Sequence, residues 1–370
     1  MAAVEFAKDA VNFLTNPPIF ISLMAVVFFV AINRRAVWTK RTAMILFPLA
    51  AVFVALSMLD PDFALIVRKA DNVPIVAMLF LVGFFVWLSM HQAYNNDARI
   101  AAGEPPIEGT PREAEKTWVW PDLVYTELLC MVIGMIVLVI WGLLLHAPIE
   151  EQANPARTPN PSKAPWYFLG LQEMLVYFDP WLAGVVFPSL IIVGLMAIPY
   201  IDVNPKGNGY FTYKERKTEI NLFMFGFLIL WVLLVMLGTF LRGPNWNFFG
   251  PYEFWDLHKL LALNNVNLSE YIWVKMLHTR LPGNMLVREI FGIVLVLFYI
   301  VVLPGLLAKR DKIFGLPIGL KRFYDKMGPY RYAVFVMLLL SMIALPIKMV
   351  LRWTITLKYV IAMPEIFFNI

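Results

Sequence analysis

The sequence is poor in the residues that bind metals or form cross-links. Its single cysteine, Cys130, excludes an intrachain disulfide, a CxxCH haem attachment site and a cysteine-ligated iron-sulfur cluster within this chain. With apolar neighbours on both sides, Cys130 is expected in the core. No two of the four histidines share an apolar segment at helical spacing, which disfavours haem ligation by two histidines of this chain alone. The possibility that one histidine contributes to a site shared with another chain stays open. The histidines are His91, His146, His258 and His278.

Charge is also scarce. Only 15% of the 370 residues are charged and 60% are hydrophobic, and the mean hydropathy of +0.68 lies outside the range of soluble domains. The chain is therefore predicted to be a polytopic membrane protein. Its net charge of +5 raises the question of nucleic-acid binding, but an excess of Lys and Arg in a membrane protein ordinarily reflects topology. We expect no nucleic-acid partner.

Several common motifs are missing as well. The first 18 residues lack the basic head and small-residue cleavage site of a signal peptide, and they are expected to lie at the membrane interface. No glycine-rich phosphate loop, HExxH metal motif or internal repeat of 20 to 50 residues occurs. We expect no metal site formed by this chain alone.

Long apolar segments dominate what is present. Eight of them have about the length that a helix needs to cross a hydrocarbon core of about 30 Å. The predicted fold is therefore an all-α polytopic membrane protein with about eight transmembrane helices. The segments are residues 18–32, 43–59, 73–94, 123–146, 181–201, 220–241, 290–307 and 332–350.

The basic residues agree with this count. Alternate loops, at residues 33–42, 95–120, 202–217 and 309–331, hold 18 of the 31 Lys and Arg residues. The positive-inside rule assigns these loops to the cytoplasm. Both termini and the loop at 147–180 then face the opposite, positive (periplasmic) side of the membrane.

That loop carries the most informative sequence. The stretch from 146 to 180 contains six prolines and an amphipathic run, residues 166–178, that predicts a short surface helix. A proline-rich link cannot cross lipid, because its unpaired backbone groups would each cost several kcal/mol there.

A second polar link, residues 103–116, predicts a module boundary. We expect modules at 1–116, with three transmembrane helices, at 117–308, and at 309–370, with a basic loop, one helix and a tail.

Three motifs in order resemble a known family. WPDLVYTELL opens a transmembrane helix, EEQANPARTPNPSKAPWYFLGLQEML follows it, and a helix ending in AIPYID comes next. This order is similar to the C-terminal half of cytochrome b in quinol-cytochrome c oxidoreductases, which exists as a separate chain, subunit IV, in quinol-plastocyanin complexes. The resemblance covers residues 120–241 well and 245–307 loosely. The first three predicted helices and the last lie outside it.

The resemblance implies a quinol-oxidation site. The PEWY-type motif of the family reads Ala164, Pro165, Trp166, Tyr167 here, so Pro165 replaces the glutamate implicated in accepting a quinol proton. The aromatic residues would line the quinol pocket, together with Phe168, although interfacial anchoring or helix packing would also explain them. Glu173 is a candidate substitute for the missing glutamate, because a carboxylate at the edge of an apolar pocket can accept a proton. The alternative is a residue solvated by lipid head groups.

Two acidic residues fall toward the other side of the membrane. Asp122 matches a family aspartate near the quinone-reduction site, but Pro121 replaces the neighbouring lysine of the family, and an aspartate also suits the start of a helix. Glu127 would cost roughly 2.5 to 3.5 kcal/mol on a central lipid-facing surface. It is therefore expected to face protein or water, with proton uptake as the functional hypothesis.

The resemblance implies a subunit of a cytochrome bc-type complex that oxidises quinol. Electrons would pass to a Rieske 2Fe-2S protein and a c-type cytochrome, and across the membrane through haem b groups held by a subunit like the N-terminal half of cytochrome b. This chain would ligate no haem alone, would be inactive alone, and would belong to a dimeric complex in a bacterial-type inner membrane. Two alternatives stay open: a quinone-interacting membrane anchor of another respiratory oxidoreductase, and a transporter.

Overall fold

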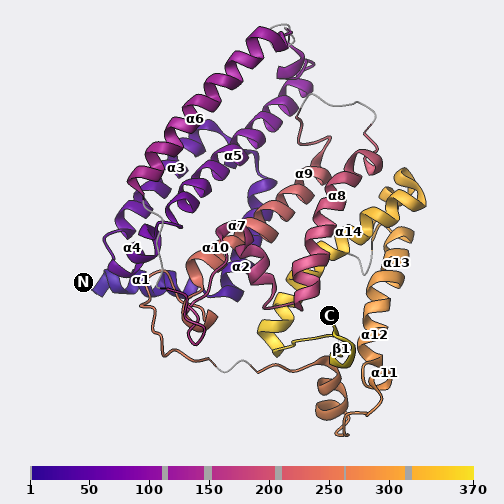
Figure 1. Ribbon diagram of the computed structural model, residues 1–370. Helices are drawn as coiled ribbons and strands as arrows, with labels where there is room; N and C mark the ends of the chain where they lie inside the picture. Colours follow the sequence, from indigo (N-terminus) through magenta and orange to yellow (C-terminus); the bar gives the residue numbers. More distant parts are fainter. Residues whose placement is uncertain (1, 111–115, 146–151, 205–210, 262–263, 313–318) are drawn as a thin grey trace. The chain divides into compact units, whose positions relative to one another are not determined.

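The computed structural model describes residues 2–110, 116–145, 152–204, 211–261, 264–312 and 319–370. Nearly all of its regular structure is helical (Figure 1), which confirms the predicted all-α class. The described residues form one small sheet, in which β1 (Ala362–Met363) pairs antiparallel with β2 (Phe368–Asn369). His146, residues 111–115 of the predicted linker and residues 147–151 of the predicted loop lie outside the described residues.

Seven helical stretches in the described part of the chain are long and apolar enough to cross a membrane. An eighth arises if Val4–Leu14 and Pro17–Ile32, bent by 82° at their junction, count as one span. The predicted number of about eight is thus confirmed. The seven stretches are Lys40–Ser57, Val73–Ala101, Val119–Leu144, Leu182–Ile201, Lys217–Leu241, Ile290–Lys309 and Lys321–Ile355.

The chain forms two compact units, each assembled from separate stretches. One comprises Met1–Trp166, Asn208–Ile229 and Thr239–Lys259, and the other comprises Tyr167–Gly207, Leu230–Gly238 and Leu260–Ile370. The division into modules at 1–116, 117–308 and 309–370 stays a prediction.

The first unit contains six α-helices before the proline-rich loop and one after it. A buried apolar cluster joins α2, α5 and α9, and it consists of Phe28, Ile32, Met90, Ala93, Tyr213, Ile220 and Met224. The helices are α1 (Ala2–Leu14), α2 (Pro17–Ile32), α3 (Lys40–Ser57), α4 (Pro61–Arg68), α5 (Val73–Ala101), α6 (Val124–Leu144) and α9 (Lys217–Met224).

Buried polar residues at the end of α5 hold two loops of the first unit. The Nδ2 atom of Asn96, which is fully buried, donates to Oε2 of Glu108 over 2.7 Å and to the Phe211 carbonyl over 2.9 Å. The carboxylate of Asp97 accepts from the Lys214 amide at 3.1 and 3.2 Å. Because buried polar groups need such partners, these contacts hold both the loop after α5 and the segment before α9 against the end of α5.

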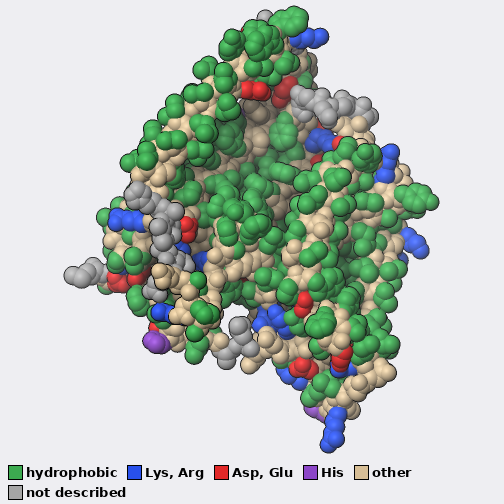
Figure 2. Space-filling model, in the orientation of Figure 1, with side chains coloured by type: hydrophobic (Ala, Val, Ile, Leu, Met, Phe, Trp, Pro, Cys, Tyr) green, Lys and Arg blue, Asp and Glu red, His purple; other side chains and the backbone are tan. Residues whose placement is uncertain are grey.

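One helix of the first unit, α6, is not covered by the described residues. No side chain of α6, all of which is described, is buried, although the helix is strongly apolar. Cys130, which was expected in the core, is exposed on this helix, and that prediction is wrong. Its apolar neighbours on α6 also face outward. The whole helix therefore requires lipid or another subunit around it. Hydrophobic side chains cover much of the molecular face seen in Figure 2.

The second unit contains α7 (Trp166–Met174), α8 (Phe187–Ile201), α10 (Leu233–Met236), α11 (Met285–Arg288), α12 (Ile290–Leu297), α13 (Leu303–Lys309) and α14 (Lys321–Ile355). Its cluster of Leu307, Tyr332, Val336 and Leu340 packs α13 on α14. The α14 backbone is interrupted at Gly328, whose φ of 74° favours glycine. The packing of α13 on α14 places the ends of the predicted spans at 290–307 and 332–350 side by side.

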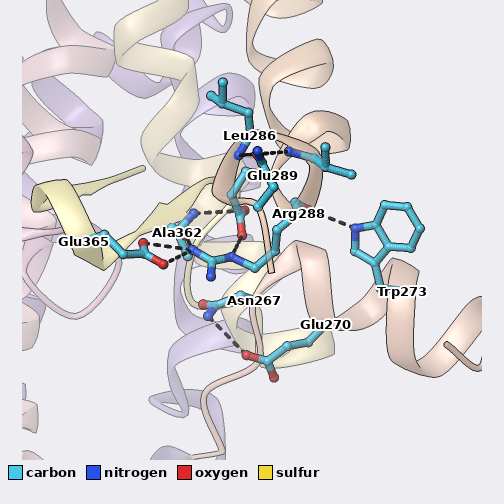
Figure 3. A network of polar contacts seen from close by, with 10 residues as sticks. Asn267, Glu270, Trp273, Leu286, Arg288, Glu289, Ala362 and Glu365 are labelled. Carbon is cyan, nitrogen blue, oxygen red and sulfur yellow. Dashed lines mark hydrogen bonds and ion pairs between the residues drawn. The ribbon is translucent and has the colours of Figure 1, made fainter. Parts of the chain in front are cut away.

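A polar network closes the C-terminal hairpin onto the start of α12 (Figure 3). Glu289 is 1% exposed, and its carboxylate accepts from Nε of Arg288 at 3.1 Å and from the Ala362 amide at 3.0 Å. Arg288 also donates to Glu365 over 2.9 Å. The contacts satisfy a buried carboxylate and fix the tail beside the transmembrane helix.

Candidate functional site

The predicted surface helix is present as α7, and it is shorter than expected. It begins at Trp166, directly after Pro165, and ends at Met174 instead of continuing to residue 178. The amides of Val176 and Tyr177 bond to carbonyls three residues back, at 3.1 and 3.0 Å, so the chain tightens into turns. The loop residues before α7 are mostly exposed, as expected for a segment outside the hydrocarbon core.

Side chains of the first unit anchor the loop that leads to α7. Asn160 and Asn245 exchange hydrogen bonds: Nδ2 of Asn160 donates to Oδ1 of Asn245 at 2.9 Å, and the Asn245 amide donates to Oδ1 of Asn160 at 2.6 Å. Nζ of Lys163 donates to the Thr239 carbonyl at 2.8 Å and lies 4.9 Å from the ring of Trp255. These contacts compensate for the lack of regular structure in the proline-rich link.

One face of α7 packs closely on the transmembrane helix that contains α10. A methyl group at Gly170 would lie 3.4 Å from the Trp231 side chain and 3.5 Å from that of Val235. One at Gly238 would lie 3.3 Å from the Leu169 carbonyl oxygen. The two glycines therefore permit the close approach of the helices.

Glu173 lies on this packed face. Its side chain is fully buried, and its Oε1 atom accepts a hydrogen bond of 3.0 Å from the hydroxyl of Tyr177, which is also fully buried. The surroundings of Glu173 are therefore protein atoms, in contrast to the alternative of solvation by head groups. A buried carboxylate supported by a donor has the chemistry of a proton acceptor, and that role stays a prediction.

The motif residues lie just before α7 and in its first turn. Pro165 is exposed, Trp166 is half-buried, and Tyr167 and Phe168 are 49% and 51% exposed. The Tyr167 and Phe168 rings are 4.7 Å apart at 60°. Helical periodicity places Trp166 and Glu173, seven residues apart, on the same side of α7. The half-exposed rings offer an apolar surface to a molecule outside this chain.

Asp122 and Glu127 lie at the start of another helix. Asp122 is in the turn Val119–Leu123 that precedes α6, and its carbonyl accepts from the Thr126 hydroxyl at 2.9 Å. This position agrees with the helix-start interpretation. Both acidic side chains are exposed, so neither is covered by the described part of this chain. Their role near a quinone-reduction site stays a prediction.

Histidine and acidic side chains form no metal cluster in the described parts of the chain: no group of three or more His, Cys, Asp and Glu residues could hold an ion. His91 on α5 uses both ring nitrogens within the protein. Its Nδ1 lies 2.7 Å from the Trp38 carbonyl and its Nε2 lies 3.0 Å from Nδ2 of Asn95. The ring stacks on Trp87 at 5.2 Å. These contacts explain His91 as a packing residue of α5.

A comparison with protein families finds a match, and it includes α7. Residues 152–252 match the family described as Cytochrome b(C-terminal)/b6/petD. This segment is cytochrome b-like. The match confirms the resemblance inferred from the motifs, and it contains the whole of α7 with Pro165, Trp166, Tyr167, Phe168 and Glu173. It supports a membrane subunit of a quinol oxidoreductase of the cytochrome b/b6 type.

The match also has limits along the chain. Residues 152–252 begin after α6, so the cytochrome b-like segment includes neither Asp122 nor Glu127. The helices before residue 152 and those after residue 252 also lie outside it. No solved structure matches the chain.

Tyr177, the hydrogen-bond partner of Glu173, was not among the predicted site residues. The two residues are four apart, the spacing at which side chains meet on a helix, so the sequence could have predicted this pair. Glu289 was not predicted either, and its partner amide at Ala362 is 73 residues away. No local pattern points to such a long-range contact.

Proposed function

We propose that this chain is a subunit of a cytochrome bc-type quinol-cytochrome c oxidoreductase and forms one wall of its quinol-oxidation site. One observation carries the proposal: the cytochrome b-like segment contains a PEWY-type motif and, two turns later, a fully buried carboxylate at Glu173. Among the alternatives, the membrane anchor of another oxidoreductase and the transporter, neither accounts for this family match.

Oxidation of a quinol releases two protons and two electrons. The half-exposed rings of Tyr167 and Phe168 would pack against the quinol ring, with Trp166 and Pro165 bordering it. Glu173 would accept one proton from a quinol hydroxyl, since Pro165 has no proton-accepting group, and the second proton would pass to a partner subunit or to water. The Tyr177 hydroxyl, 3.0 Å from Oε1, would hold the carboxylate in place. This chain would thus contribute binding and proton transfer.

The redox groups would belong to partner subunits. A Rieske 2Fe-2S protein and a c-type cytochrome would take one electron, and haem b groups on a subunit resembling the N-terminal half of cytochrome b would take the other. The complex would be dimeric. Both termini and the 147–180 loop would face the positive, periplasmic side of a bacterial-type inner membrane.

The decisive experiment is purification of the native complex through a tag on this chain, followed by redox difference spectra and an assay of quinol-cytochrome c reductase. Haem b, haem c and inhibitor-sensitive reductase activity in one complex are expected. A complex with a molybdenum or iron-sulfur oxidoreductase and no haem b would overturn the proposal. The orientation is checked by labelling cysteines at Asn154 and Glu104 in a Cys130→Ala background; the proposal requires Asn154→Cys alone to react from the periplasm.

A further inference from the structure

Three basic side chains gather where α14 ends in the second unit. Lys348 and Arg352 are one turn apart on α14, and Lys358 follows in the segment after the helix. Lys348 is 4% exposed and Arg352 is 8% exposed, while Lys358 is half-buried. Basic residues at the end of a membrane-spanning helix ordinarily reach toward water or lipid head groups. Here two of them are enclosed by protein.

No described carboxylate forms an ion pair with the nitrogen atoms of this cluster. Nζ of Lys348 is buried and has no hydrogen-bond partner among the described residues. It lies 5.6 Å from the centre of the Phe178 ring and 5.9 Å from that of Tyr359. Among the described residues, Arg352 donates to neutral oxygens only: the carbonyls of Asn264 at 3.3 Å and Thr356 at 3.0 Å, and Oδ1 of Asn265 at 2.5 Å.

The three charges also repel one another. Lys348 experiences the positive charges of both Arg352 and Lys358. Burial and the charge of Arg352 lower the pKa of Lys358, and the carboxylate of Asp179 opposes this shift. Asp179 is itself bonded by the Tyr359 hydroxyl at 3.3 Å and by Nδ2 of Asn369 at 3.0 Å. The Asp179 carboxylate thus acts on Lys358. In the described parts of the chain, no ion pair joins it to any of the three cations.

An unpaired buried ammonium group costs several kcal/mol of folding free energy. Two ammonium groups and a guanidinium in one place call for an anion with more than one negative charge or several acceptor oxygens. A phosphate group meets this requirement and is the usual ligand of clustered Lys and Arg residues. At the end of a membrane-spanning helix, phosphate groups are also what the lipid head groups present.

We propose that Lys348, Arg352 and Lys358 form a binding site for a phosphate group. An anionic phospholipid head group and free inorganic phosphate share this chemistry. The three basic residues lie outside the cytochrome b-like segment, whereas Phe178 and Asp179 beside them belong to it. The bound anion would neutralise the cluster and stabilise the packing of the α14 end on the turn at Phe178.

The test uses the purified complex with its full set of subunits. The variants are Lys348→Met, which removes the buried charge while keeping an apolar chain of similar length, and Lys358→Gln, whose half-buried position makes misfolding a small risk. Lys321→Gln, at the exposed start of the same helix, is the matched control. Retained phospholipid is quantified by mass spectrometry after exhaustive detergent washing. Thermal unfolding is then measured with phosphatidylcholine, with phosphatidylglycerol or with inorganic phosphate.

A lipid site predicts that the wild type and Lys321→Gln retain a stoichiometric anionic phospholipid and gain thermal stability with phosphatidylglycerol. Lys348→Met and Lys358→Gln would lose both the lipid and the gain. A gain with inorganic phosphate alone, lost in the same two variants, identifies free phosphate as the source. Equal retention in all four proteins, or equal responses to the three additions, would overturn the proposal.

Discussion

The hydroxyl of Tyr177 donates a hydrogen bond to Oε1 of Glu173 across 3.0 Å, and neither side chain is exposed. Glu173 is on α7, and Tyr177 is in the turn that follows it. The pair lies within a segment whose family motif has proline where a proton-accepting glutamate is expected. The relationship therefore gives Glu173 a defined orientation as well as a buried environment.

Replacing the carboxylate of Glu173 should reduce quinol oxidation without affecting assembly of the complex. Glu173→Gln keeps the size and the hydrogen-bonding capacity of the side chain but cannot accept a proton, so we expect assembly with normal haem content and a loss of turnover of about 10²-fold or more. The measurement is steady-state quinol-cytochrome c reductase activity of the purified complex.

Pro165→Glu in the Glu173→Gln background is the companion variant. It restores the family glutamate, and a partial recovery of turnover is expected if proton transfer is the missing step. Unchanged turnover in Glu173→Gln alone would show that Glu173 does not accept the proton. The assignment of this chain as a subunit would then be judged from the haem content of the complex.

Removing the Tyr177 hydroxyl should have a smaller effect than removing the Glu173 carboxylate. Tyr177→Phe deletes one hydrogen bond, which is worth about 1 to 3 kcal/mol at a charged partner, and it leaves the proton acceptor in place. We expect turnover to fall by about 5- to 150-fold, with normal assembly and haem content. Turnover equal to that of the wild type would show that the hydrogen bond does not support catalysis.

The close packing at Gly170 should be sensitive to added volume. Gly170→Val would push a side chain into Trp231 and Val235, and overpacking of this kind costs about 1 to 3 kcal/mol. We expect a lower thermal midpoint and reduced quinol oxidation, because α7 would be displaced. Gly134→Val on α6 is the control, since no described atom outside the adjoining helix backbone lies within 4 Å of the added carbon. Equal effects of the two variants would contradict the packing described for α7.

Asp60 should stabilise the first unit in a pH-dependent manner. Burial acts to raise the pKa of Asp60, but hydrogen bonds from Lys8 at 2.8 Å and from the amides of Phe63 and Asp62 outweigh it, and the pKa is lowered. A lowered pKa means that the stabilisation is present above the unfolded value of about 3.9 and is lost as the pH falls through the folded value. Asp60→Ala should cost about 1 kcal/mol at neutral pH, through loss of the helix cap of α4.

The measurement for Asp60 is thermal unfolding of the detergent-solubilised complex at several pH values. The difference between wild type and Asp60→Ala should shrink below about pH 4. Asp60→Asn, which keeps a capping oxygen but loses the ion pair with Lys8, should fall between them at neutral pH. A difference that is independent of pH would show that the charge of Asp60 contributes nothing.

The membrane-spanning organisation could be predicted from the sequence because it depends on the length and apolar character of continuous segments. Seven of the predicted spans coincide with the long apolar helices of the structure, and the short first segment, 18–32, corresponds to α2. The helix after Pro165 was also predictable, since an amphipathic run beside a proline-rich loop is a local signal. Its end at Met174 was not, because turns after a helix depend on what the chain packs against.

The sequence by itself determined the membrane class, the approximate spans and a cytochrome b-like segment with a motif lacking its glutamate. Only the tertiary structure decided which polar groups are enclosed. Glu173, Glu289 and Lys348 are buried while Glu127 and Cys130 are exposed, yet all five lie in or beside apolar sequence. The residue types show that burying these charges would be unfavourable. Only the packing of distant segments determines whether a charge is buried and which partner stabilises it.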